Sequence, residues 1–177
     1  KDYTIRADGS TIVEVNYKLN TIKFTVSYSA GVSAVVVEDS YSKTRLYGAD
    51  LGENTYMFEA LYTTKLVLSV ELERGYAMHA WQLNDKNYLP NSGVTAGFTY
   101  DVGTTEFSLR AVAVAKTITI SFNPNDGTSE VPTQQVSFGS STPLRRNSFK
   151  RDGYVFVGWA LTEDGDVMYK NGEVIKV

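Results

Sequence analysis

The chain has 177 residues, a formal net charge of −3 and no cysteine. Its basic residues are scattered, and Arg145-Arg146 and Lys150-Arg151 are their only clusters. Nucleic acids, anionic membranes and polyanionic glycans are bound by neutralising their charge with a basic face, so the composition argues against them as partners. No disulfide or thiolate metal site can form, and no apolar run approaches the roughly 20 residues that span a bilayer.

The amino-acid composition favours strands, since Tyr, Phe, Val and Thr are abundant. Residues that favour helices do not form a long amphipathic pattern anywhere in the sequence. We expect a mostly β fold, α+β at most. At the N-terminus, Tyr3–Ala7 and Thr11–Tyr17 flank Asp8-Gly9, a pair typical of tight turns. Because Val13, Val15 and Tyr17 alternate with polar residues, this segment predicts a β-hairpin.

Further along, apolar and polar residues alternate with the period of two that a half-buried strand requires. The segments with this pattern, or with a short apolar run, are 22–28, 35–37, 66–72, 106–113 and 117–122. Glycine-containing turns separate them, including Asn91-Ser92-Gly93 and Asn125-Asp126-Gly127. Two short helical turns are expected as well, at 56–62 and, after Pro143, at 144–148.

One pattern occurs twice, as Gly75–Trp81 and Gly153–Trp159, with the form Gly-Tyr-x-apolar-x-small-Trp. Repetition of this kind predicts two modules, at 21–115 and 116–177, after an N-terminal segment 1–20. On a regular strand the Tyr and the apolar residue share one face and the Trp lies on the other. We expect each Trp to anchor a core; the alternative is an exposed ring that stacks on a sugar.

A search for catalytic chemistry finds no supporting group of residues. The single histidine, His79, has no nucleophile motif beside it, and no phosphate-binding glycine loop is present. Acidic pairs such as Glu38-Asp39 and Glu71/Glu73 are expected on solvated faces rather than in a glycosidase site. We therefore expect no enzyme, no cofactor and no catalytic residue.

The sequence gives only weak indications of calcium binding and of an intramolecular cross-link. The run Glu163-Asp164-Gly165-Asp166 has oxygen ligands but lacks the spacing of a calcium loop, so a solvated turn is expected and no metal. An intramolecular Lys–Asn cross-link is known in surface stalks, and Lys23, Lys65 and Lys116 lie on expected strands, but no pattern selects one of them.

Residues 117–177 resemble the Listeria–Bacteroides repeat family, which includes the B-repeat of listerial internalins. The matching segments are Ile118–Thr128, Gln135–Gly139, Leu144, Asn147–Phe149, Arg151–Trp159, Gly165, Tyr169 and Asn171-Gly172. Asp126 departs from the pattern, where the family usually has Gly. The block 21–115 looks like a divergent copy, with Gly75-Tyr76, Trp81 and Phe107–Val112 in place but Ala80 where Gly is typical. Residues 3–17 look like the tail of a preceding repeat.

The resemblance implies two tandem β-grasp-like modules in a secreted or wall-attached bacterial protein, where they act as a stalk, spacer or adhesion unit. It carries no catalytic residues. It also implies a closing strand that the second module is expected to lack at Val177, leaving an edge for self-association. The implied partners are a host or bacterial surface protein or a glycan.

The alternative is a carbohydrate- or protein-binding module appended to a secreted enzyme. A binding module should present several aromatic rings on one solvent face, whereas a spacer should bury them. The rings that discriminate are those expected in or near turns: Tyr41, Tyr47, Tyr88 and Tyr100. The sequence assigns no residue to a binding site.

Overall fold

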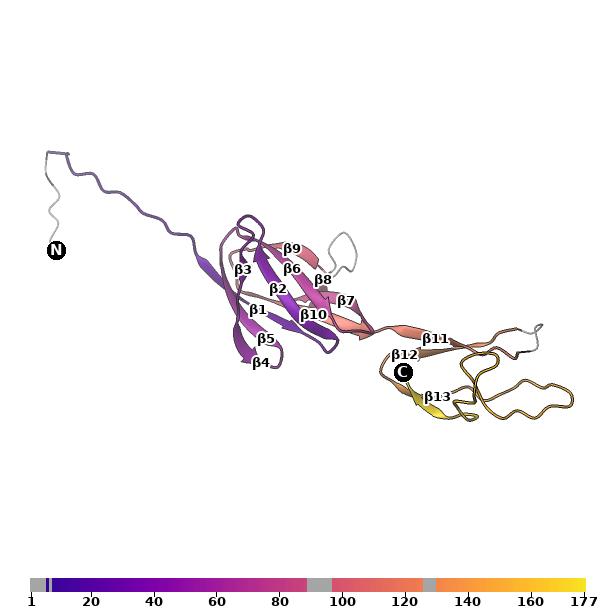
Figure 1. Ribbon diagram of the computed structural model, residues 1–177. Coiled ribbons are helices and arrows are strands. Elements are labelled where there is room, and N and C mark those ends of the chain that lie inside the picture. Colours follow the sequence, from indigo (N-terminus) through magenta and orange to yellow (C-terminus); the bar gives the residue numbers. More distant parts are fainter. Residues whose placement is uncertain (1–5, 7, 89–96, 126–129) are drawn as a thin grey trace.

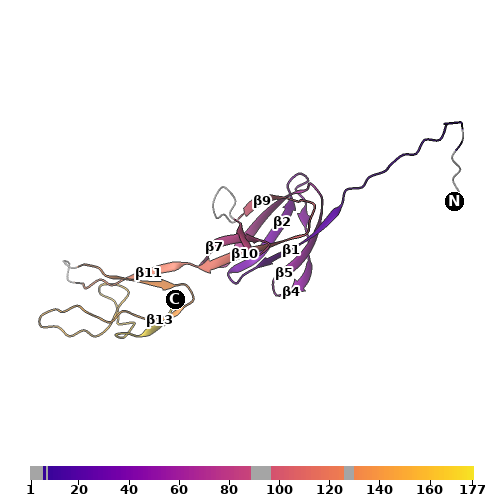
Figure 2. The ribbon, with the colours of Figure 1, turned by 180° about the vertical axis from the view of Figure 1, so that it is seen from behind.

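The computed structural model of the protein describes residues 6, 8–88, 97–125 and 130–177. The described residues form strands and no helix, which confirms the mostly β fold. Two folded modules lie end to end, and an extended N-terminal segment leaves the first module at its far end (Figure 1). The same elongated arrangement is seen from behind in Figure 2.

The first module contains two sheets. The six-stranded sheet has the order β4-β5-β1-β10-β7-β8. Its strands are β1 Thr21–Tyr28, β4 Ala49–Gly52, β5 Thr55–Leu61, β7 Tyr76–Leu83, β8 Lys86–Tyr88 and β10 Phe107–Ala115. The four-stranded sheet has the order β3-β2-β6-β9. Its strands are β2 Val32–Asp39, β3 Arg45–Leu46, β6 Lys65–Leu72 and β9 Gly97–Asp101. β1 and β10 pair in parallel, and the other neighbours pair antiparallel.

The apolar residues of the predicted alternations form one core between these sheets. Phe24 and Val26 of β1, Leu66 and Leu68 of β6, and Leu109 of β10 are among its most buried members. Aromatic rings cross this core in a row, each within about 6.4 Å of the next. The row runs Phe58, Phe24, Phe107, Tyr100, Tyr88, Phe98 and Trp81. Rings pack well at such separations, so the row contributes both apolar burial and aromatic contacts to the stability of the module.

The second module is smaller and less regular. It has β11 Thr117–Ser121 paired with β12 Thr133–Ser137, and β13 Ser141–Pro143 paired with β14 Val174–Lys176. Phe122, Val136 and Leu144 are its buried apolar residues. The Gln134 side chain joins β12 to the segment after β13, because it accepts from the Arg145 amide at 2.8 Å and donates to the Pro143 carbonyl at 2.8 Å.

Several local expectations are wrong. Residues 56–62 belong mostly to strand β5, where Tyr56 and Phe58 pair with β1, and 144–148 contains no helical turn. The turn at Asp8-Gly9 is present, since the Asp8 carboxylate accepts from the Ser10 amide at 2.9 Å. The hairpin around it is not formed in the described residues, because Thr11–Tyr17 contains no strand. An isolated pair of strands is only marginally stable in water, and the described residues 11–17 are mostly exposed.

The predicted strands at 22–28, 35–37, 66–72, 106–113 and 117–122 are confirmed. The β-grasp arrangement is not confirmed, since the first module is built from two sheets. The turn expected at Asn91-Ser92-Gly93 and position Asp126 lie outside the described residues.

Candidate functional site

The repeated Gly-Tyr-x-apolar-x-small-Trp pattern has a different structure in each module. In the first module it forms β7, and the pairing with β10 shifts so that His79 is an extra residue between Met78 and Ala80. This bulge changes the alternation, so Tyr76, Met78 and Trp81 all pack on the core. The expectation that the Trp lies on the opposite face from the Tyr is therefore wrong for this copy.

In the second module the pattern is irregular. Tyr154, Val155 and Val157 are exposed, and Trp159 makes a single bridge to Tyr169. Trp159 is half-buried among the rings of Phe122, Phe149 and Phe156, at centroid distances of 4.8, 6.3 and 5.0 Å. The two tryptophans lie in separate clusters, since Trp81 packs in the first module against Phe98 at 4.8 Å. They do not line a common cleft.

The other residues singled out by sequence do not converge. His79 is exposed, and Asp39 holds a turn by accepting from the Tyr41 and Ser42 amides at 2.7 and 3.2 Å. Lys23 lies 3.8 Å from the Glu59 carboxylate, with both side chains more than half exposed. Within the described parts of the chain, no three acidic, histidine or cysteine residues are grouped to hold a metal. No helix of those parts is long and apolar enough to cross a membrane.

The junction between the modules is the first feature with a bearing on function, because it is short and hydrogen-bonded on both sides. β10 ends at Ala115 and β11 begins at Thr117, so only Lys116 separates them. The Lys116 amide donates to the Gly75 carbonyl of the first module at 2.8 Å. The Lys116 carbonyl accepts from the Phe138 amide of the second module at 2.9 Å. A single residue is thus hydrogen-bonded to both modules, which leaves little freedom for a hinge.

Side chains strengthen the same junction. The rings of Tyr76 and Phe138 meet edge to face at 6.1 Å. Gly75, with φ of +85°, allows this approach, because a β-carbon there would lie 2.3 Å from the Phe138 ring. The Tyr76 ring in turn lies against Gly31, where a β-carbon would come within 2.1 Å. β11 therefore follows β10 directly in one line across the junction (Figure 2).

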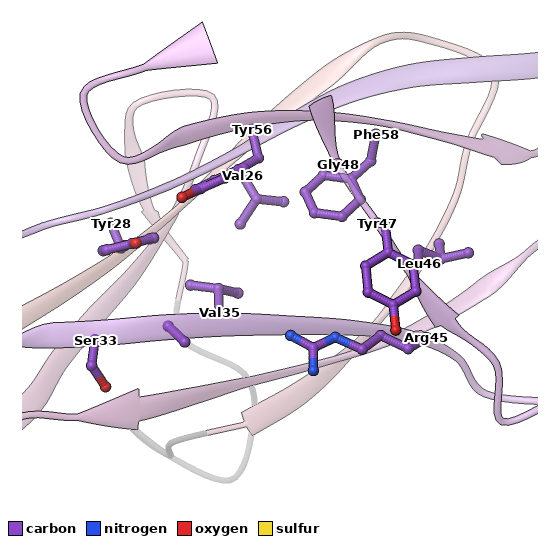
Figure 3. Close-up of a pocket in the computed structure, with 11 residues that line it drawn as sticks. Val26, Tyr28, Ser33, Val35, Arg45, Leu46, Tyr47, Gly48, Tyr56 and Phe58 are labelled. Atoms are coloured by element: carbon purple, nitrogen blue, oxygen red, sulfur yellow. The ribbon is translucent and has the colours of Figure 1, made fainter. Parts of the chain in front are cut away.

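The second feature is a groove at one side of the first module, between the two sheets (Figure 3). It encloses a cavity of about 240 Å³. Its walls are Val26, Tyr28, Ser33, Ala34, Val35, Arg45, Leu46, Tyr47, Gly48, Tyr56 and Phe58. The chain crosses from one sheet to the other at Tyr47-Gly48, where a β-carbon on Gly48 would be 2.7 Å from Phe58. Because the chain leaves the four-stranded sheet directly after Leu46, β3 has only two residues.

Polar and apolar groups line this groove together. Arg45 lies over the Tyr47 ring, with its guanidinium carbon 5.5 Å from the ring centroid. The Tyr28 and Tyr56 rings stack at 6.2 Å. The hydrogen bond between their hydroxyls, with burial as a lesser cause, raises the pKa of Tyr28 above its ordinary value. No motif in the sequence identified this groove.

Of the four tyrosines expected to discriminate spacer from binding module, two are partly buried against the core. Tyr88 and Tyr100 belong to the aromatic row, and burial raises the pKa of Tyr100. Tyr41 and Tyr47 are 97% and 83% exposed.

Fold and junction together define an all-β protein in which a two-sheet module is joined end to end to a small repeat module. Residues 119–177 match the family model of the Listeria-Bacteroides repeat domain, which confirms the resemblance seen in the sequence. The match covers the second module, and the kinship of 21–115 with this family stays a prediction. Searches of curated proteins and of solved structures found no significant match.

Proposed function

We propose that this chain is a non-catalytic repeat region of a secreted or cell-surface bacterial protein, in which the joined modules act as a stiff spacer. The observation that carries the proposal is the junction, where Lys116 is hydrogen-bonded to Gly75 and Phe138 and leaves no free linker. A spacer must hold its direction over distance, and domains joined by a mobile linker do not. The family of the second module, a surface repeat domain, supports the location.

The test is to loosen the junction without touching either core. Insertion of Gly-Ser-Gly-Ser after Lys116 should break the hydrogen bond from the Phe138 amide to the Lys116 carbonyl and the Tyr76–Phe138 contact, while both modules keep their melting temperatures. Small-angle scattering should then show a shorter and broader distribution of distances than the original chain. The control is the same insertion at Glu53-Asn54, a turn between β4 and β5 in the first module. An original chain that already scatters as a bent and flexible pair would contradict the spacer role.

The cell-surface location has its own test. Antibodies against this region should label intact cells of the source bacterium, and protease treatment of those cells should remove the label. Labelling that requires permeabilised cells would contradict it.

A binding role is the second candidate, and the groove beside Arg45 and Tyr47 is the observation in its favour. With Tyr88 and Tyr100 partly buried against the core, a flat aromatic platform for a glycan is not supported by those two rings. If the spacer role is correct, binding at the groove is an additional property of the same module.

A further inference from the structure

The strand edge that borders the groove has no strand beside it in the described structure. β3 pairs with β2 only at Val37–Leu46 and Glu38–Arg45, whereas β2 continues back to Val32. The Ser40 amide bonds to the Lys65 carbonyl at 2.7 Å, so even-numbered positions of β2 direct their backbone groups to β6. Asp39 bonds to Thr44 at 2.9 Å, so odd-numbered positions face β3. The N–H and C=O of Val35 therefore point away from β6, to the side of β2 where β3 would lie if it continued past Leu46.

The cavity lies directly against this edge. Ser33, Ala34 and Val35 of β2 line it from one side, and Val26 and Phe58 of the other sheet line it from the other. A strand residue placed opposite Val35 would direct its side chain to the same face as Val35, which is toward the cavity. A volume of about 240 Å³ lies below the 300–1,000 Å³ typical of drug-sized ligands, and suits one aliphatic side chain.

The outer face beside the free edge carries one guanidinium, that of Arg45, next to the carboxylate of Glu38. Arg45 is opposite Glu38 and so lies on the outer face, with Tyr47 two residues on. No ion pair of Arg45 occurs in the described residues, where the pair found is Lys23–Glu59. A strand that continues the β3 line would place its outward residues within reach of this guanidinium.

The chain itself carries a segment with the complementary pattern. Val13, Val15 and Tyr17 form one face of the N-terminal segment and are 76%, 69% and 92% exposed. Glu14 lies between the two valines on the other face. Val13-Glu14-Val15 is symmetric, so in either strand direction it offers a valine to the inside and a carboxylate to the outside.

We propose that Thr11–Tyr17 of a second copy of the chain adds as a strand to the free edge of β2, with a valine in the cavity and Glu14 beside Arg45. Addition of an extended segment to a sheet edge is a common mode of peptide recognition. A second copy supplies the segment because each chain's own segment leads away from the first module in both views (Figures 1 and 2). Since each copy has one donor and one acceptor, the contact gives either a reciprocal dimer or a growing row of side-by-side chains.

The experiment uses the full chain in a concentration series. Sedimentation velocity should show self-association, and the Val35 amide should gain protection from hydrogen exchange as concentration rises. Val13→Lys with Val15→Lys should weaken the association about tenfold or more, because the cavity loses its apolar side chain. The control is Ile12→Thr with Asn16→Thr, which changes the other face without adding positive charge beside Arg45 and should leave the association within about twofold.

A charge exchange separates this contact from unspecific association. Glu14→Arg alone and Arg45→Glu alone should each weaken self-association. A mixture of these two variants should recover it, because the donor of one chain then meets the acceptor of the other with opposite charges. Melting curves at low concentration should be unchanged for all variants.

Three results would overturn the proposal. One is a chain that stays monomeric at millimolar concentration. Another is association that survives the double valine substitution. The third is Val35 protection independent of concentration, which would mean that the segment folds back onto its own chain.

Discussion

Gly75 and Phe138 belong to different modules, yet a β-carbon on Gly75 would lie 2.3 Å from the Phe138 ring. Gly75 also has a positive φ, and its carbonyl accepts the Lys116 amide. The turn before β7 and the turn after β12 thus contact each other closely at Gly75 and Phe138. If the chain is a spacer, this contact is where its stiffness arises.

Gly75→Ala should therefore loosen the junction. The alanine pays about 1–2 kcal/mol for its left-handed conformation, and it must also displace the Phe138 ring, which overpacking data place at about 1–3 kcal/mol more. Gly153→Ala is the matched control, since φ is +79° there and nothing lies within 4 Å of the added carbon. Denaturant unfolding compares the two free energies, and the Phe138 ring signals in NMR report the displacement. Equal costs at both positions would contradict a close contact at the junction.

The two tryptophans should respond differently to substitution. Trp81 is fully buried, so Trp81→Ala should lower the free energy of unfolding of the first module by about 3–5 kcal/mol. Trp159 is half-buried, and its indole nitrogen is inaccessible and has no hydrogen-bond partner in the described structure. Such a group costs about 1–3 kcal/mol, so removing it offsets part of the lost packing. Trp159→Phe should consequently be nearly neutral while Trp159→Ala destabilises the second module, as measured by thermal unfolding. A Trp159→Phe variant as unstable as Trp159→Ala would show that the nitrogen is satisfied.

His79 offers a test of the bulge in β7. Because the side chain is exposed, His79→Ala should change stability by no more than about 0.5 kcal/mol. Deleting His79 should instead prevent folding of the first module, since without the extra residue Tyr76 and Met78 cannot share a face with Trp81. Circular dichroism and proteolysis distinguish the outcomes. A folded deletion variant would show that the register of this strand is not fixed by the bulge.

Much of the fold was predictable because its causes are local. The alternation in β1, β6, β10 and β11 follows from a single buried face on each strand. The helical turn expected at 56–62 failed because pairing with β1 decides the conformation of β5, and that partner is distant in sequence. The face of Trp81 was predicted incorrectly because one bulge reverses all later positions.

The sites were less predictable than the strands. Nothing in the local sequence reveals that Lys116 bonds to both Gly75 and Phe138, since these partners lie 41 and 22 positions away. The groove depends on where β3 ends, and that follows from the close fit of Gly48 against Phe58. The exposed Val13-Glu14-Val15 is visible in the sequence, but its alternation is that of any half-buried strand and therefore predicts a hairpin.

The paired tyrosines of the groove, Tyr28 and Tyr56, should make the protein less stable as the pH becomes alkaline. The hydrogen bond with Tyr56 raises the pKa of Tyr28 above the ordinary value of 10.0. A pKa raised in the folded state gives stability that is fully present below the unfolded pKa and is lost as pH rises through the folded one. The melting temperature of the original chain should thus fall steeply above about pH 10. For Tyr28→Phe, the free energy of unfolding below pH 10 should be lower by about 0.5–1.5 kcal/mol because of the lost hydrogen bond. Its melting temperature should then fall less steeply as pH rises. Tyr41→Phe, at a 97% exposed position, is the control and should keep the original slope. Identical slopes for the original chain and Tyr28→Phe would mean that the hydroxyl pair does not form in solution.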